Sequence, residues 1–111
     1  MKLKDLKNKS ILVLGIGREG LSVLKFLHKK FPSKKIAVAD KKNFLDLPKY
    51  IDKTYFGENY LDAVFDYDVI IKSPGIPYFE QIKQAKNNGK IITSSTEIFL
   101  KTCQGKVIGV T

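Results

Sequence analysis

The stretch that decides the fold is Ile11-Leu12-Val13-Leu14-Gly15-Ile16-Gly17-Arg18-Glu19-Gly20-Leu21-Ser22. Four apolar residues of strand character meet three glycines spaced G-x-G-x-x-G, and an amphipathic run follows at once, so the order predicts a strand, a tight turn and a helix. Gly15 permits the turn, Gly17 leaves room for an anion at the backbone, and Gly20 lets the helix pack closely on the strand. The first N–H groups of a helix are unpaired and lie at its positive end, which favours a phosphate site over a purely structural turn.

The predicted helix spans residues 18–31 and places Leu21, Leu24, Leu27 and Phe31 on one broad buried face, because these side chains recur at spacings of three and four. A helix of this kind packs on a sheet formed by the strands on either side of it.

A second buried strand is predicted at residues 36–40, and it ends in the carboxylate of Asp40. In a strand-helix-strand unit that binds a nucleotide, the end of the second strand lies beside the glycine turn. Asp40 follows the last glycine of the turn at the spacing of about 20 residues at which an acid accepts hydrogen bonds from a ribose or a base. Capping of a turn is the alternative role for this carboxylate.

The alternation of strands and helices continues along the chain. Further elements are expected as a helical turn at 44–47, a brief strand at 54–56, a helix around 61–65, strands at 69–72 and 91–93, and a helix at 79–88. Residues 73–77 place two prolines around a glycine, which predicts a rigid loop at the edge where open α/β sheets bind ligands. Ser94 and Glu97 form a capping box for a last helix. The pattern predicts one α/β domain, Rossmann-like and three-layered, with a mainly parallel sheet.

Composition limits the classes of function. The chain has 111 residues and a formal net charge of +9, which suits one domain and raises the question of nucleic acid as a partner. Arg18 is the only arginine among 20 basic residues, and the lysines are scattered, which favours a solvated surface instead. The sequence shows no signal peptide, no apolar stretch of about 20 residues and no cluster of metal ligands. We therefore expect a soluble cytoplasmic protein with no metal site, no membrane contact and no nucleic acid.

Several motifs together carry a resemblance to a known family. They are the glycine turn followed by Leu21-Ser22, the acid Asp40, the loop Ser73-Pro74-Gly75-Ile76, the run Glu97-Ile98-Phe99 and the terminal run Val107-Ile108-Gly109-Val110-Thr111. Nearly the whole chain resembles the amino-terminal domain of the Mur ligases, and the Ser-Pro-Gly-Ile loop points to the branch that adds D-glutamate. The resemblance implies an enzyme of peptidoglycan precursor synthesis that uses ATP and magnesium to join D-glutamate to UDP-N-acetylmuramoyl-L-alanine through an acyl phosphate.

The resemblance also assigns the site. It implies that the domain holds the UDP end of that substrate, with residues from three segments. The glycine turn of Gly15, Gly17 and Gly20 with Arg18 and Glu19 faces the diphosphate, Asp40, Lys41 and Lys42 face the uridine, and Ser73, Pro74 and Gly75 face the diphosphate and sugar. The sequence departs from the family pattern at two places. Relatives often have a small or hydroxyl residue in place of Glu19, and a hydroxyl residue followed by arginine in place of Lys41-Lys42.

By the same resemblance, residues 1–105 form the substrate-binding domain and residues 106–111 begin the first strand of a central, ATP-binding domain. The ATP-binding loop of the family would follow Thr111, so no catalytic, cofactor-binding or metal-binding residue is expected in this chain. We expect the central and carboxy-terminal domains as partners, and no ligase activity from the 111 residues alone.

Two other functions remain open. An NAD-binding Rossmann domain of a regulatory protein or an oxidoreductase shares the glycine turn and the acid at the end of the second strand. A basic nucleic-acid-binding module is the weaker alternative.

Overall fold

The computed structural model describes residues 6, 8–42, 47–94 and 97. The elements, in chain order, are β1 (Ile11–Leu14), α1 (Gly17–Lys30), β2 (Ile36–Asp40), β3 (Ile51–Phe56), the 3-10 helix η2 (Tyr60–Asp66), β4 (Val69–Lys72), α2 (Glu80–Asn87) and β5 (Ile91–Ser94). Three parts of the predictions lie outside the described residues: residues 44–46 of the helical turn predicted at 44–47, the helix after Glu97 and the last strand at 107–111.

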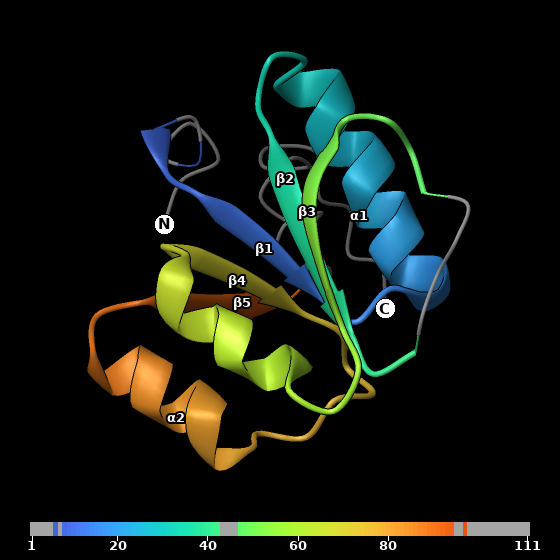
Figure 1. Ribbon diagram of the computed structural model, residues 1–111. Helices are drawn as coiled ribbons and strands as arrows, with labels where there is room; N and C mark the ends of the chain where they lie inside the picture. The colour runs from blue at the N-terminus through green and yellow to red at the C-terminus, as the bar shows by residue number, and fades with distance from the viewer. Residues whose placement is uncertain (1–5, 7, 43–46, 95–96, 98–111) are drawn as a thin grey trace, which may run out of the picture.

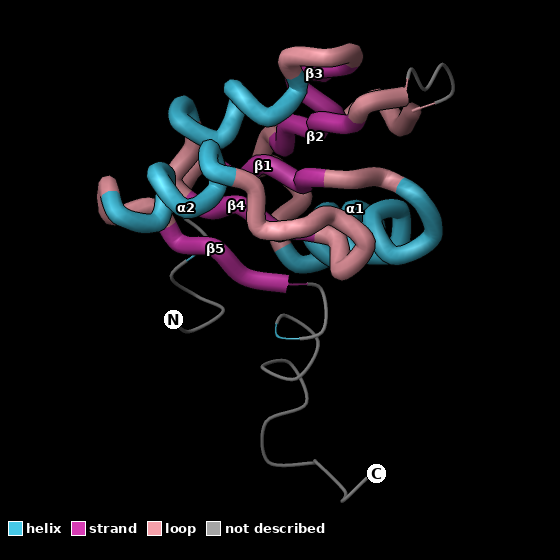
Figure 2. The backbone as a smooth tube through the Cα atoms, turned by 90° about the horizontal axis from the view of Figure 1, so that it is seen from below, coloured by secondary structure: helices cyan, strands magenta, loops and turns pink. Residues whose placement is uncertain are grey.

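The five strands form one parallel sheet in the order β3-β2-β1-β4-β5. Figure 2 shows them side by side in this order. From β1 the chain builds outward through β2 and β3, and it then returns to the other side of β1 for β4 and β5. This order confirms the predicted α/β, Rossmann-like fold.

The sheet separates two apolar layers, because successive side chains of each strand point to opposite faces. On one face, Ile11 and Val13 of β1 pack with the buried side of α1. On the other face, Leu12 and Leu14 pack beneath η2 and α2. Figure 1 shows α1 on one side of the sheet and α2 on the other. Strands buried on both faces explain the continuous apolar runs in the sequence.

One expectation about α1 is wrong. Leu21 is 43% exposed, and the buried stripe of the helix contains Val23, Leu24 and Leu27. Gly20 lies on the same stripe, and an α-helix turns by about 100° for each residue, so Leu21 points well away from the sheet.

Two further elements differ from the predictions. β3 begins at Ile51, three residues before the predicted strand at 54–56. The prediction missed its first half because this part is largely exposed and carries Asp52 and Lys53, as edge strands often do. The helix around 61–65 is a 3-10 helix.

The predicted capping contact is confirmed where the structure describes it. The N–H of Glu97 donates to Ser94 Oγ at 3.2 Å, and the Glu97 carboxylate accepts a hydrogen bond from Thr93 Oγ1 at 3.1 Å.

Candidate functional site

The site lies where the strand order changes direction, at the carboxyl ends of β1 and β4. These neighbours pair with Leu14 opposite Lys72, so the loops that follow them leave the sheet side by side. Sheet hydrogen bonds continue into both loops, because the N–H of Gly15 donates to the Ala39 carbonyl at 2.8 Å and the N–H of Ser73 donates to the Leu14 carbonyl at 2.9 Å. Open α/β sheets bind ligands in the crevice at such a point.

Gly15 is the point at which the two loops touch. Its φ is +92°, and a Cβ added there would lie 2.8 Å from both Ser73 Cβ and Ile76 Cδ1. The turn therefore needs glycine for its backbone conformation and also for the close approach of the second loop.

The other two glycines of the turn have different surroundings. A Cβ on Gly20 would lie 2.5 Å from the carbonyl oxygen of Gly15, which confirms that this glycine permits close packing of α1 on the end of β1. Gly17 has a φ of +59°, and a Cβ there would meet no described atom within 4 Å. The space above the start of α1 is therefore open, as a bound anion would require.

Asp40 holds two turns through its carboxylate. Oδ2 accepts a hydrogen bond from the N–H of Ile16 at 2.8 Å, and Oδ1 accepts one from the N–H of Lys42 at 2.9 Å. Asp40 thus ties the end of β2 to the residue that precedes α1, which is the capping role given above as the alternative. A contact between Asp40 and a ligand stays a prediction.

The loop after β4 is a tight turn held by Lys72. The N–H of Ile76 donates to the Ser73 carbonyl at 3.1 Å, and Lys72 Nζ donates to the carbonyls of Ser73 and Ile76 at 3.1 and 2.6 Å. A Cβ added at Gly75 would meet only Ser73 Oγ, at 4.0 Å, among the described atoms. The packing of the loop therefore does not require a glycine at this position, and its small size leaves backbone accessible to a ligand.

These segments surround a hollow of about 300 Å³ lined by Gly15, Ile16, Gly17, Asp40, Lys41, Tyr60, Ser73, Gly75 and Ile76. Six of these nine were predicted site residues. The other predicted residues lie around the hollow: Arg18, Lys42 and Pro74 are exposed, Gly20 is buried beneath the turn, and the side chain of Glu19 lies outside the described part.

Three of the lining residues were not among the predicted site residues: Ile16, Tyr60 and Ile76. Lys72, which holds the loop after β4, was not predicted either. Tyr60 stands third after Gly57, which ends β3, and no motif marks it. Burial raises the pKa of Tyr60 above its ordinary value, and the negative charge of Asp40 raises it further. The Tyr60 hydroxyl therefore stays protonated at neutral pH and is available as a hydrogen-bond donor.

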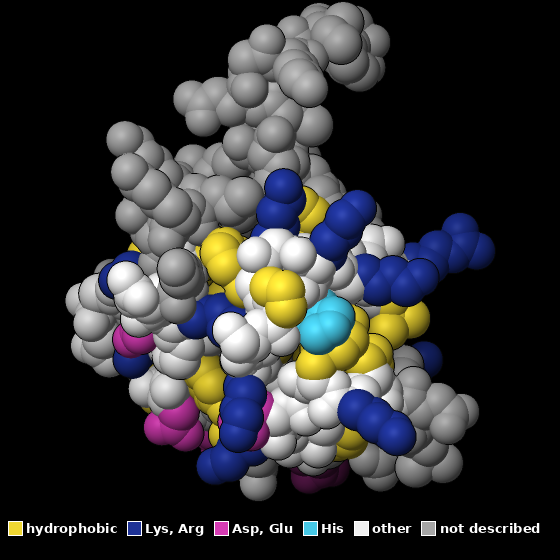
Figure 3. All heavy atoms as spheres, turned by 90° about the horizontal axis from the view of Figure 1, so that it is seen from above, with side chains coloured by type: hydrophobic (Ala, Val, Ile, Leu, Met, Phe, Trp, Pro, Cys, Tyr) yellow, Lys and Arg dark blue, Asp and Glu magenta, His cyan; other side chains and the backbone are white. Residues whose placement is uncertain are grey.

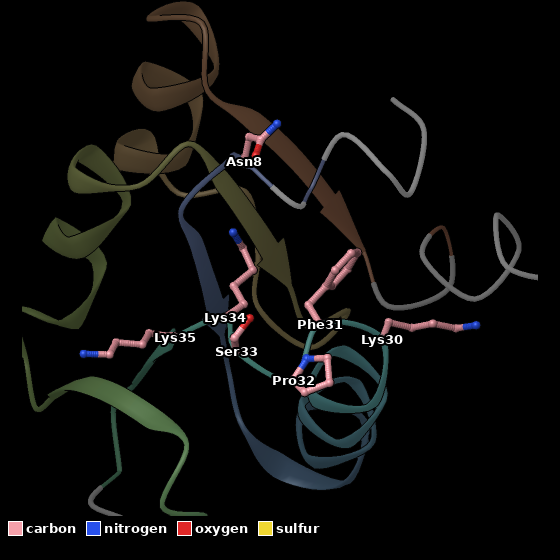
Figure 4. A pocket seen from close by; sticks show the side chains of 7 residues that line it. All are labelled: Asn8, Lys30, Phe31, Pro32, Ser33, Lys34 and Lys35. Carbon is pink, nitrogen blue, oxygen red and sulfur yellow. The ribbon is translucent and has the colours of Figure 1, made fainter.

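A larger hollow, of about 590 Å³, lies near the amino ends of β1 and β2, at the opposite end of these strands from the candidate site. Figure 4 shows the residues that line it. Lys30 and Lys35 point away from this hollow in opposite directions, while Lys34 points towards Asn8. Figure 3 shows the lysine and arginine side chains spread around the molecule in that view, without one dense patch among the described residues. Although this hollow is larger, we favour the hollow of about 300 Å³ as the candidate site, because ligands of open α/β sheets bind at the carboxyl ends of the strands.

Residues 6, 8–42, 47–94 and 97 contain no group of three or more histidine, cysteine or acidic residues able to hold a metal ion. Across the same ranges, no helix has the length and apolar character needed to cross a membrane.

Comparison with known proteins identifies the family. A family model described as "Mur ligase MurD-like, N-terminal domain" matches residues 9–94, which include the whole candidate site. The chain belongs to this Mur ligase family. The matched segment begins just before β1 and ends with β5.

Curated relatives of this Mur ligase domain are named UDP-N-acetylmuramoylalanine--D-glutamate ligase. The protein from Clostridium botulinum strain Hall is 38% identical over 99% of the chain, and that from Acetivibrio thermocellus is 33% identical over 97%. The chain spans about a quarter of these relatives, 26% and 24% of their lengths. None of these findings favours the NAD-binding alternative.

Proposed function

We propose that this chain is the domain that holds the UDP end of UDP-N-acetylmuramoyl-L-alanine in an ATP-dependent ligase that adds D-glutamate. The observation that carries the proposal is the convergence of the glycine turn, the Ser73 loop and the end of β2 on one hollow at the sheet's switch point. The names of the curated relatives support the choice of substrate.

The geometry supports a division of the hollow between parts of the ligand. The diphosphate would lie at the start of α1, where Gly17 leaves open space and the first N–H groups of the helix favour an anion. Arg18, exposed in the first turn, adds positive charge there. The uridine would lie towards Asp40 and Lys41, and the sugar towards Ser73 and Gly75.

ATP, magnesium and the acyl-phosphate chemistry belong, in this proposal, to the central and carboxy-terminal domains of a longer ligase. The proposal places the enzyme in the cytoplasm, with no membrane or nucleic acid as partner. This chain's part is to bind and orient one end of the substrate.

The choice of ligand tests the proposal directly. We expect UDP to shift the amide resonances of Gly15, Gly17 and Gly75 more than NAD does at equal concentration, because the diphosphate of UDP would lie between the glycine turn and the Ser73 loop while its uridine reaches Asp40 and Lys41. The measurement is a pair of NMR titrations of the labelled chain. Saturable NAD binding without a response to UDP would contradict the proposal.

The chain by itself is expected to have no ligase activity. Transfer of a phosphoryl group needs a loop that holds ATP and magnesium, and the sequence contains no Gly-Lys-Ser or Gly-Lys-Thr motif. Incubation with UDP-N-acetylmuramoyl-L-alanine, D-glutamate, ATP and magnesium should release phosphate only at the background rate. Release that depends on both substrates and survives repeated purification would show a nucleotide site in these 111 residues.

A further inference from the structure

Tyr60 occupies a fixed place on the wall of the hollow. It is the first residue of η2, and backbone hydrogen bonds tie its segment to the end of β2. The N–H of Gly57 donates to the Asp40 carbonyl at 3.2 Å, and the N–H of Tyr60 donates to the Gly57 carbonyl at 3.3 Å. The sheet therefore positions this side chain, as it positions the glycine turn.

The two ends of the Tyr60 side chain have different surroundings. Its ring is half-buried and packs against the apolar layer beneath η2 and α2. Its hydroxyl makes no hydrogen bond to another residue in the described ranges. Tyr55 and Tyr67 pack on the same layer, but their hydroxyls bond to each other at 2.9 Å. The Tyr60 hydroxyl is thus available to water or to a ligand.

The neighbouring carboxylate is already engaged. Both oxygens of Asp40 accept backbone N–H groups, from Ile16 and Lys42, so its first task is structural. Tyr60 can make two contacts with a nucleoside, because it has an apolar ring surface for packing and a neutral O–H donor for a hydrogen bond.

The position along the sheet indicates which part of a ligand reaches Tyr60. Adjacent strands lie about 4.8 Å apart, so a ligand with a phosphate on the turn after β1 carries its next group over the end of β2. Asp40 and Lys41 stand at that end, and Tyr60 completes the wall beside them. The Ser73 loop lies on the other side, next to β4.

We propose that Tyr60 binds the nucleoside of the ligand, with its ring packed against the base or ribose and its O–H donating to a nucleoside oxygen. The inference rests on the proposed function and adds a residue that selects the nucleoside end of the substrate. The glycine turn binds the phosphates independently of Tyr60.

Two substitutions and two ligands test this role by calorimetry and NMR. Tyr60→Phe removes only the donor, and we expect UDP affinity to fall about threefold to tenfold, the scale of one hydrogen bond. Tyr60→Ala also removes the ring, so its loss of UDP affinity should be larger. Inorganic pyrophosphate should shift the amides of the glycine turn equally in both variants and in the original chain.

Tyr67→Phe is the matched control, because it removes a hydroxyl that bonds to Tyr55 and does not line the hollow. It should leave UDP affinity unchanged. If the original chain binds UDP and Tyr60→Ala binds it equally well, the role of Tyr60 is wrong and the proposed function stands. Equal losses for UDP and pyrophosphate would also overturn it, since they would show a general disturbance of the site. If the original chain does not bind UDP, the proposed function fails first.

Discussion

Replacing Gly15 by alanine is expected to destabilise the chain by about 2 to 6 kcal/mol, the sum of backbone strain and overpacking. The backbone at Gly15 has a φ of +92°, which L-residues rarely adopt. The new Cβ would also lie 2.8 Å from Ser73 Cβ and Ile76 Cδ1, so the loop after β4 would have to move. A loss of this size is a large part of the 5–15 kcal/mol by which domains are typically stable.

The same substitution at Gly57 separates the two causes. Gly57 has a φ of +103°, but a Cβ there would meet no atom of the described residues within 4 Å. Gly57→Ala should therefore cost only the strain, about 1–3 kcal/mol. Urea unfolding of both variants gives the two free energies. Equal losses would show that the contact between the loops does not restrict residue 15.

Much of the fold was predictable because the central strands are buried on both faces. Residues 11–14, 36–39 and 69–71 are continuous apolar runs, and the structure places strands at all three. The first half of β3 escaped prediction because an exposed edge strand carries no such signal. The alternation pattern also leaves the order of the strands open, since the order depends on which faces the helices cover.

The candidate site was predictable as separate pieces. The spacing of the glycines and Asp40 is a local signal, and the structure brings them to one edge of the sheet. Their contacts depend on strand register, which sequence spacing does not show. The pairing of Leu14 with Lys72 brings the Ser73 loop against Gly15, and it places Lys72 where its ammonium can hold that loop.

The structural role of Asp40 could not be decided from its position in the sequence. Its spacing from the turn predicts a ligand contact, which stays a prediction, and the structure shows that its carboxylate also accepts hydrogen bonds from two backbone N–H groups. Tyr60 lines the hollow, but no sequence motif marks it, so the sequence did not predict it as a site residue.

Replacing Gly17 by asparagine is expected to lower UDP affinity at least about tenfold while the fold is retained. Asparagine adopts positive φ more readily than other residues with a side chain, so the φ of +59° at this position is tolerated. Its side chain would fill the open space above the start of α1, where the proposed diphosphate needs direct access to the backbone. Calorimetry with UDP gives the affinity, and a factor of ten corresponds to about 1.4 kcal/mol.

Gly89→Asn is the matched control for this variant. Gly89 also has a positive φ, +91°, and a Cβ there would meet no described atom within 4 Å. It precedes β5, however, and so lies at the amino end of the strands, opposite the end that carries the hollow. Its substitution should leave UDP affinity unchanged, because the side chain is added far from the hollow. If Gly17→Asn keeps the amide spectrum of the folded chain and binds UDP as tightly as Gly89→Asn does, the diphosphate does not approach the backbone at Gly17. The phosphate site would then have to be sought on the Ser73 loop alone, where Gly75 leaves the backbone accessible.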